Sequence, residues 1–517
     1  MNLMNANLYT LFQSRFPADD AAIAIETAGG RLYSYAELQR ITAHYAGLIR
    51  ALGVEPGDRV AVQVEKSAEA LFLYLACLKV GAIYLPLNSA YQEGEIDYFL
   101  GDAEPKIFVH QPRSEAWVIP VCERRGVQHR FVLPAEGEQV KPQHLRASWH
   151  ENALEAAPML EVASRADDDL AAILYTSGTT GRSKGAMITH RNLSSNALTL
   201  HQFWGFQPGD VLLHALPLFH VHGLFVACHT ALLNGSRMIF HAKFDARAAI
   251  DALPRASVFM GVPTMYVRLL AEPGFNRDVC RSVRLFVSGS APLLAETFAE
   301  FLSRTDHTIL ERYGMTETGM ITSNPLNGMR RGGTVGLPLP GVSVRVMNDD
   351  GGPCAPDEIG HLQVAGPNVL PGYWRLPEKN KEEFTTDGFF KTGDVGKIDA
   401  DGYVSIVGRS KDLVISGGYN VYPKEIELLI DELPGVAESA VIGLPHPDFG
   451  EAVAAVVVSS AGGGAPAEAD IIAALKGKLA AFKVPKRVFV VDDLPRNAMG
   501  KVQKNELRKR YASTFVG

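Results

Sequence analysis

The sequence has few cysteines, and those present form no metal or redox motif. Its 517 residues include five cysteines, at scattered positions, and no two of them are separated by only two residues. Zinc sites and dithiol centres need ligands at short, regular spacing. The pattern therefore argues against a zinc site, and it favours reduced thiols in the cytoplasm.

The sequence also lacks an excess of positive charge. Fifty Lys and Arg residues stand against 57 Asp and Glu residues, for a net charge of -7. Proteins whose main partner is nucleic acid or an anionic membrane need a basic surface, so we expect neither partner. A basic cluster at 501–510 leaves a nucleic-acid patch as a minor alternative to a solvated surface.

No apolar run is long enough to suggest a membrane span. The most apolar stretch, 211–233, is interrupted by one proline and four histidines, which a membrane helix would have to bury at high cost. The segment 1–15 has no basic start followed by a continuous apolar run, so it does not resemble a secretory signal. Both observations favour a cytoplasmic protein.

The first third of the chain alternates between strand and helix patterns. Ser34 and Glu37 form a capping-box pattern at the start of a helix that reaches about residue 52. A strand at 59–64, a helix at 67–80 and a strand at 82–87 follow. Such alternation predicts a parallel sheet covered by helices, and hence an α/β fold.

The second half of the sequence predicts a β-rich subdomain and a small C-terminal lobe. Between 341 and 409, short apolar segments separated by Gly, Pro and Asp indicate an antiparallel, barrel-like β subdomain. Beyond it, a helix that starts at Pro423, a helix at about 470–481 and strands at 438–442, 453–459 and 487–491 predict a small α+β lobe. We therefore expect a large N-terminal domain, 1–409, which contains the β-rich part 341–409, and a C-terminal lobe, 410–517.

A loop rich in Gly, Ser and Thr follows the apolar segment 170–175 (LAAILY) and reads TSGTTGRSKG from Thr176 to Gly185. It is not a Walker loop, because Lys184 is followed by Gly185. The subsequence GRSKG matches a serine-hydrolase elbow, but it lies too far from the strand to form that sharp turn. The glycines leave backbone N–H groups accessible, and together with the hydroxyls and cations of the loop these groups could bind a triphosphate. The alternative is a surface loop without a ligand.

Three later motifs accompany this loop in a familiar order: YGMTET at 313–318, KTGD at 391–394 with GRSKD at 408–412, and RNAMGK at 496–501. Together they resemble the signatures of the adenylate-forming superfamily, which comprises acyl-CoA synthetases, peptide-synthetase adenylation domains and luciferases. The resemblance implies a large α/β adenylation domain, a small mobile C-terminal lobe, and the use of ATP with Mg²⁺. Ser183 replaces a proline that is common in the family, and it leaves the phosphate-binding groups in place.

The resemblance also assigns a nucleotide site. Thr176 and Glu317 would hold Mg²⁺, since hard oxygen ligands suit that ion; Tyr313 would stack on adenine and Asp394 would bind the ribose hydroxyls. From the residues alone, Tyr313 could equally be a core residue and Asp394 a turn residue. The implied ATP- and AMP-binding residues are Thr176, Ser177, Gly178, Thr179, Thr180, Gly181, Lys184, Ser290, Ala291, Pro292, Glu311, Arg312, Tyr313, Gly314, Thr316, Asp394, Arg409 and Lys501.

Catalysis is assigned to Lys501, Glu317 and Thr176 by the same resemblance. A substrate carboxylate attacks the α-phosphorus, and the cationic Lys501 stabilises the charge on the phosphoryl oxygens. The acyl-adenylate is then attacked by the thiol of coenzyme A. In the family the C-terminal lobe rotates between these steps, and this implies a hinge at Lys411. The implied coenzyme A segment is Ser416, Gly417, Gly418 and Tyr419.

Several stretches resemble the malonyl-CoA synthetase branch in particular, including HALPLFHVHGLFVA at 214–227 and RLFVSGSAPLL at 284–294. In that branch an arginine at the start of the second stretch meets the distal carboxylate of malonate, which implies this role for Arg284. A guanidinium is suited to a carboxylate that would otherwise be buried unpaired. His220 would line the same acyl pocket, although a core histidine is an equal alternative.

Other functions stay open at this point. The acid could be methylmalonate, another short dicarboxylate or a fatty acid, or the acceptor could be a carrier protein. A catalytically silent nucleotide-binding protein is an alternative of another class. We expect small-molecule substrates, a monomer or homodimer, and a lysine acetyltransferase acting on Lys501 as a regulatory partner.

Overall fold

The computed structural model describes residues 5–138, 148–176, 183–416, 419–460, 466–476, 478–497 and 501–516. The chain divides into two compact units. The first comprises Met1–Ser343 and Ala365–Gly388, and the second Val344–Val364 and Phe389–Gly517. Most of the β-rich segment 341–409 thus groups with the C-terminal residues. The sequence analysis had instead assigned this segment to the N-terminal domain. A functional boundary at 409/410 stays a prediction.

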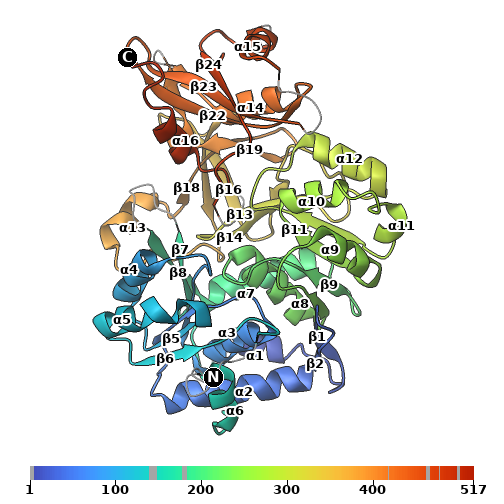
Figure 1. Cartoon of the computed structure of the whole chain (residues 1–517), viewed down its shortest axis with the longest axis vertical. Helices are drawn as coiled ribbons and strands as arrows, with labels where there is room; N and C mark the ends of the chain where they lie inside the picture. Colours follow the sequence, from blue (N-terminus) through green and yellow to red (C-terminus); the bar gives the residue numbers. More distant parts are fainter. Residues whose placement is uncertain are drawn as a thin grey trace. The chain divides into compact units, whose positions relative to one another are not determined.

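A largely parallel sheet forms one layer of the first unit, as the strand and helix alternation predicts. Its order is β6-β5-β3-β4-β7-β8, and only the pairing of β7 with β8 is antiparallel among the described pairs. Helices α4 and α5 pack on one face through Phe99, Leu100 and Val121 (Figure 1). The strands are β3 Arg59–Gln63, β4 Ile83–Pro86, β5 Ile107–His110, β6 His129–Val132, β7 Leu170–Thr176 and β8 Lys184–Thr189.

The second sheet of this unit has the order β15-β14-β13-β12-β11-β9-β10-β1-β2 within the described residues. The strands from β1 to β13 along this order are parallel, so their carboxyl ends share one edge. The strands are β1 Ile23–Thr27, β2 Leu32–Ser34, β9 Val211–His214, β10 Arg237–Phe240, β11 Val258–Gly261, β12 Leu285–Ser288, β13 Leu310–Met315, β14 Gly319–Ser323 and β15 Leu337–Pro338.

Helices cover these sheets as their sequences predict. The capping box of Ser34 and Glu37 is formed at the start of α2. Helix α3 is apolar on all sides, and its buried residues extend over nearly its whole length, as a helix inside the core should be. The helices of this unit are α1 Leu8–Gln13, α2 Tyr35–Ala51, α3 Ala68–Val80, α4 Glu93–Ala103, α5 Glu115–Arg125, α6 Trp149–Glu155, α7 His190–Phe203, α8 His229–Asn234, α9 Ala246–Ala252, α10 Pro263–Leu270, α11 Arg277–Cys280, α12 Ala295–Thr305 and α13 Pro377–Glu383.

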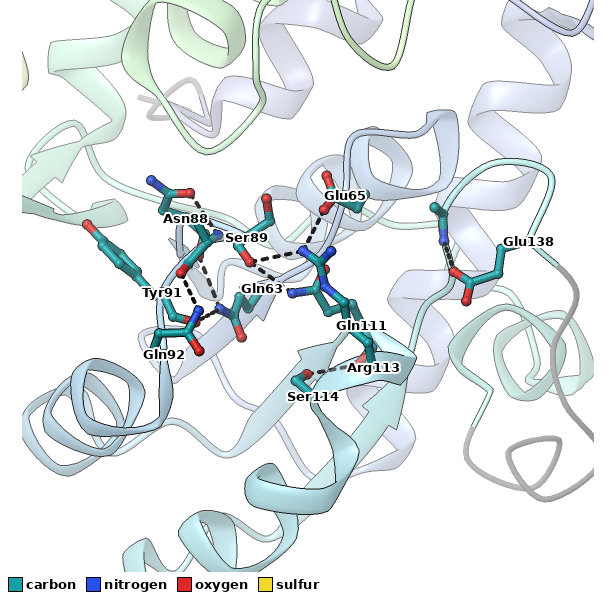
Figure 2. Close-up of polar contacts among 12 residues, drawn as sticks. Gln63, Glu65, Asn88, Ser89, Tyr91, Gln92, Gln111, Arg113, Ser114 and Glu138 are labelled. Atoms are coloured by element: carbon teal, nitrogen blue, oxygen red, sulfur yellow. Dashed lines mark hydrogen bonds and ion pairs between the residues drawn. The ribbon is translucent and has the colours of Figure 1, made fainter. Parts of the chain in front are cut away.

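Polar side chains fix the loops at the carboxyl edge of the six-stranded sheet (Figure 2). Gln63, at the end of β3, donates from Nε2 to the carbonyl oxygens of Asn88 and Tyr91 at 3.1 and 2.8 Å. Gln111, just after β5, donates to the carbonyl oxygen of Ser89 at 2.9 Å. The loop that follows β4 is therefore held by side chains at the ends of β3 and β5, the next two strands on one side of β4. No helix in the described ranges is long and apolar enough to cross a membrane.

The second unit contains the predicted antiparallel β segment. Its strands follow the linear order β16-β17-β18-β19, so the part of the chain described here forms an open sheet and not a closed barrel. Their bounds are β16 Ser343–Met347, β17 Gly360–Ala365, β18 Phe390–Ile398 and β19 Val404–Arg409.

The rest of the second unit is the small α+β lobe. A long hairpin of β22 and β23 is extended by β20, β21 and the parallel strand β24. Helix α14 begins with Pro423 and packs Ile426 and Ile430 on one face of the sheet, as predicted, while α16 packs Leu507 on the other. The elements are β20 Val414–Ser416, β21 Tyr419–Val421, α14 Pro423–Asp431, β22 Val436–His446, β23 Gly450–Ser459, α15 Glu468–Lys476, β24 Arg487–Val491 and α16 Lys504–Arg510.

Candidate active site

The turn after β13 carries the carboxylate predicted to bind metal. A Cβ atom on Gly314 would lie 2.2 Å from the carbonyl oxygen of Gly319, so only glycine allows β13 and β14 to approach this closely. The tight turn between them presents Glu317, which is 7% exposed. Backbone geometry therefore places this carboxylate at the carboxyl edge of the parallel strands, where α/β sheets usually bind ligands.

Two hydroxyl groups hold Glu317 in place. Thr176, the last residue of β7, donates to Oε1 at 3.2 Å, and Tyr373 donates to the same oxygen at 3.1 Å. Thr176 and Glu317 thus come together from different sheets, as the sequence predicted for the metal pair. Their hard oxygen atoms fit Mg²⁺, which commonly takes one or two carboxylates and completes its shell with phosphate and water oxygens. The role of Tyr373 was missed, because it lies in no recognisable motif.

Replacing Tyr373 by Phe tests the orientation of Glu317. Removing a hydrogen bond to a charged group costs about 1.5–3 kcal/mol, so we expect a lower kcat and a higher Mg²⁺ requirement. Titration of activity with MgCl₂ measures both quantities. Glu317→Gln should show a larger effect of the same kind, whereas an unchanged Mg²⁺ dependence in both variants would exclude this metal site.

Lys184 already has a partner in the protein. Its Nζ lies 3.0 Å from Oε1 of Glu383 and 4.0 Å from the centre of the Tyr373 ring, and its side chain is 11% exposed. A phosphate would therefore share this cation with Glu383 or replace that carboxylate. The predicted phosphate-binding residues between these two ends of the loop lie outside the described residues: Ser177, Gly178, Thr179, Thr180 and Gly181.

The predicted adenine-binding residues lie at the ends of β12 and β13. Tyr313 and Thr316 are half-buried, and Ser290 begins the turn that continues to Ala291 and the exposed Pro292. Ser290 adopts φ 73°, which is uncommon for a residue other than glycine. Glu311 accepts a hydrogen bond from the backbone N–H of Leu293 at 3.0 Å, so this buried carboxylate holds the turn in place.

A buried cation lies beside this turn. Arg312 is 3% exposed, and its Nε and Nη2 atoms have no hydrogen-bond partner among the described residues. A Cβ atom on Gly289 would lie 2.4 Å from Cζ of Arg312, so the guanidinium lies against the backbone at the end of β12. Burial lowers the pKa of Arg312 to about 9, which shows how poorly the surroundings solvate its charge.

Two further polar groups near Arg312 are buried without partners in the described structure. They are Nε2 of His222, at the start of the π-helix His222–Cys228, and Oγ of Ser288. Nδ1 of His222 lies 3.3 Å from Oγ of Ser290. Burial, and secondarily the charge of Arg312, keeps the pKa of His222 well below its usual range. A buried guanidinium and a buried imidazole nitrogen therefore lie close together at the end of β12, where the carboxylate of Glu311 also acts on Arg312. Their unused donors suit a small anion.

The structure gives Arg284 an ion-pair partner within the protein. This residue precedes β12, at its amino end, and it binds Asp210 through both Nε and Nη2, with Nε at 2.9 Å from Oδ1. The length of β12, roughly 13 Å at ~3.3 Å per residue, separates it from the site edge. Its charge is thus already paired with Asp210, and its role as the carboxylate receptor stays a prediction. Of the two acyl-pocket residues, only His220 lies near the site, half-buried two residues before His222.

The remaining predicted residues belong to the second unit. Asp394 is 2% exposed and pairs with Nε of Arg409 at 2.6 Å, across β18 and β19. Lys501 is exposed, and Lys411 lies in the short 3₁₀ turn Ser410–Asp412. Of the coenzyme A segment, Ser416 ends β20 and Tyr419 stacks on Phe482, whereas Gly417 and Gly418 lie outside the described residues.

Known proteins resemble this chain over most of its length. A feruloyl-CoA synthase of Amycolatopsis sp is 37% identical, covering 93% of this chain and 95% of that protein. A malonate–CoA ligase of Arabidopsis thaliana is 34% identical, covering 94% and 86%. A crystal structure of ATP-bound MatB from Rhodopseudomonas palustris is 53% identical, with a TM-score of 0.94 and coverage of 99% and 100%.

Family models match both parts of the chain. Residues 12–374 match the AMP-binding enzyme model, and residues 425–501 match the model of the AMP-binding enzyme C-terminal domain. The first match includes the Thr176–Glu317–Tyr373 contact, and the second ends at Lys501. The chain therefore belongs to the family of AMP-binding enzymes.

Proposed function

We propose that this protein is an ATP-dependent malonate–CoA ligase. It would join malonate to ATP to form malonyl-AMP and pyrophosphate, and then transfer the malonyl group to coenzyme A with release of AMP. The relatives named as a feruloyl-CoA synthase and a malonate–CoA ligase support the reaction class. The observation that carries the choice of acid is the buried guanidinium of Arg312, which has Nε and Nη2 without partners in the described structure.

In the first step, one carboxylate of malonate attacks the α-phosphorus of ATP and pyrophosphate leaves. Bound Mg²⁺ would neutralise part of the phosphate charge, with Glu317 and Thr176 holding it. The cationic side chain of Lys501 stabilises the charge that spreads over the phosphoryl oxygens. Tyr313 would stack on adenine, while Asp394, which already accepts from Arg409, would accept from the ribose hydroxyls.

In the second step, the thiolate of coenzyme A attacks the malonyl carbonyl carbon, and the carbon–oxygen bond to AMP breaks. The exposed Lys501 belongs to the predicted C-terminal lobe, 410–517, which would rotate about Lys411 between the steps. Ser416 and Tyr419 would then line the path of the thiol. This motion would gate the chemistry by exchanging the groups at the reaction centre.

The buried guanidinium of Arg312 would select the acid, because its Nε and Nη2 atoms lack hydrogen-bond partners in the described structure. The carboxylate of malonate that does not react would pair with the guanidinium, with a further hydrogen bond from His222. A monocarboxylate such as acetate would fill the site without neutralising the cation, and a site with unpaired buried groups rejects such analogues strongly. An aromatic acid such as ferulate would likewise place apolar atoms against a buried charge.

A panel of acids tests this proposal. Malonate, methylmalonate, succinate, acetate, octanoate and ferulate are each incubated with ATP, MgCl₂ and coenzyme A, and AMP and thioester are quantified. We expect the highest kcat/KM with malonate. Higher values with octanoate or ferulate would contradict the assignment of the acid, whereas no AMP with any acid would indicate a silent nucleotide-binding protein.

The acceptor is tested in the same assay. Replacing coenzyme A by a pantetheinylated carrier protein should abolish thioester formation if free coenzyme A is the substrate. Faster transfer to the carrier protein would instead assign a carrier-loading adenylation domain. Oligomeric state, acetylation of Lys501 and a cytoplasmic location stay predictions from the sequence.

A further inference from the structure

The loop that carries Lys501 is closed at its base by backbone hydrogen bonds. Arg496 and Val502 form an antiparallel bridge. The backbone N–H of Asn497 donates to the carbonyl oxygen of Lys501 at 3.0 Å, and the N–H of Lys501 donates to Oδ1 of Asn497 at 3.0 Å. The backbone of Lys501 is thus fixed by one residue across the loop, although its side chain is exposed.

Ion pairs tie both ends of this loop to the lobe beneath it. Before Lys501, Arg496 pairs with Glu438 of β22. After it, Nζ of Lys504 lies 2.5 Å from Oε1 of Glu427 on α14, and these two side chains are 16% and 7% exposed. The second pair is nearly buried, and Lys424 Nζ lies farther away, 3.7 Å from Oε2 of the same carboxylate. Breaking a pair this deeply buried is costly.

Glu427 is itself fixed to the lobe. Its Oε1 accepts a hydrogen bond from the backbone N–H of Val441 in β22 at 2.9 Å. Lys504 therefore binds a carboxylate that is held by the central hairpin of the lobe, and not a mobile surface residue.

The basic cluster at 501–510 is consequently not a uniform surface patch. Lys504 is paired with Glu427, and Arg508 lies 2.8 Å from Asp412. Lys509 and Arg510 are exposed. Lys504 and Arg508 thus form ion pairs within the lobe. The exposed Lys501 lies three residues before Lys504.

We propose that Arg496 and Lys504 are positioning residues for Lys501. A lysine side chain is long and flexible, so the place of its charge depends on how firmly its backbone is held. The two ion pairs and the Asn497 hydrogen bonds hold the backbone on both sides of Lys501 before substrate binds, which removes an entropic cost from the adenylation step. This inference rests on the proposed role of Lys501 in adenylation.

Half-reaction kinetics test the proposal. Arg496→Met and Lys504→Met should lower kcat of adenylation by about 10²-fold, as small misplacements of a catalytic group can, with little change in KM for ATP. Malonyl-CoA formation from supplied malonyl-AMP should be retained, because Lys501 acts only in adenylation. Pyrophosphate release measures the first step and thioester formation the second.

Matched variants separate positioning from general effects. Lys509→Met removes an exposed cation from the same helix and should leave both steps unchanged. Lys504→Arg keeps the charge and should retain most adenylation. The exchange of Arg496→Glu with Glu438→Arg restores the pair in reverse and should recover activity that Arg496→Glu alone loses.

Three outcomes would overturn the proposal. If both half-reactions fall together with a lower Tm, the ion pairs only stabilise the lobe. If adenylation is unchanged in both Met variants while Lys501→Ala loses it, the loop needs no such anchoring. If Lys501→Ala itself retains adenylation, the proposed catalytic role fails first, and the positioning role fails with it.

Discussion

Lys501→Ala is expected to lower the rate of malonyl-AMP formation by about 10²–10³-fold, the effect of removing one group that stabilises transition-state charge. A lysine side chain presents a compact ammonium group on a flexible stem. Without it, the negative charge that develops on the phosphoryl oxygens loses a compensating cation. Pyrophosphate release with malonate and ATP measures this step directly.

The second half-reaction provides the internal control for Lys501→Ala. Malonyl-CoA formation from supplied malonyl-AMP should proceed at close to the normal rate, because the thiol attack uses other groups. Lys501→Arg should recover only part of adenylation, since a guanidinium keeps the charge but differs in shape. Equal loss of both half-reactions in the Ala variant would rule out a lobe that exchanges its residues between the two steps.

Arg312→Met should lower kcat/KM for malonate. The corresponding loss of transition-state stabilisation is about 2–5 kcal/mol, the cost of truncating one partner of a buried charge pair. This corresponds to roughly 30- to 4,000-fold at ~1.4 kcal/mol per tenfold change. Activity with acetate should fall much less, because acetate has no second carboxylate to pair with the guanidinium. The ratio of the two kcat/KM values therefore reports the role of Arg312 in choosing the acid.

Arg284→Met is the matched control for Arg312→Met, because the two arginines differ in their partners. Arg284 is paired with Asp210, which is 5% exposed in its side chain, so its loss should lower Tm without changing the malonate-to-acetate ratio. Arg312 has no such partner in the described structure, so its loss should change that ratio without lowering Tm. Malonate should also raise the Tm of the unsubstituted protein but not that of Arg312→Met. The reverse pattern would return the carboxylate role to Arg284.

Several local features could be predicted because they depend on neighbouring residues. The capping box of Ser34 and Glu37, the start of α14 at Pro423 and the strand Arg487–Val491 all appear where the sequence places them. Thr176 and Glu317 were paired by resemblance, and the structure brings them to 3.2 Å. In each case the pattern is either short in range or carried by a motif.

Other features depend on contacts between distant segments. The sequence could not reveal Tyr373 as a partner of Glu317, because 56 residues separate them. It also could not show that Lys504 and Arg508 are tied to Glu427 and Asp412 instead of facing solvent. A cluster of charges has the same appearance in a sequence whether its members are paired or free.

The sequence by itself determined the reaction class, since the loop from Thr176 and the motifs around Glu317, Asp394 and Lys501 carry their chemistry in residue type and order. Only the tertiary structure distinguished the surroundings of the two arginines. Arg284 stands at the amino end of β12 and is neutralised by Asp210, whereas Arg312 stands on the next strand, level with the carboxyl end of β12, and is buried with Nε and Nη2 lacking partners in the described chain. The physical reason is that strand direction and burial, and not position in a motif, determine whether a charged side chain has an ion-pair partner.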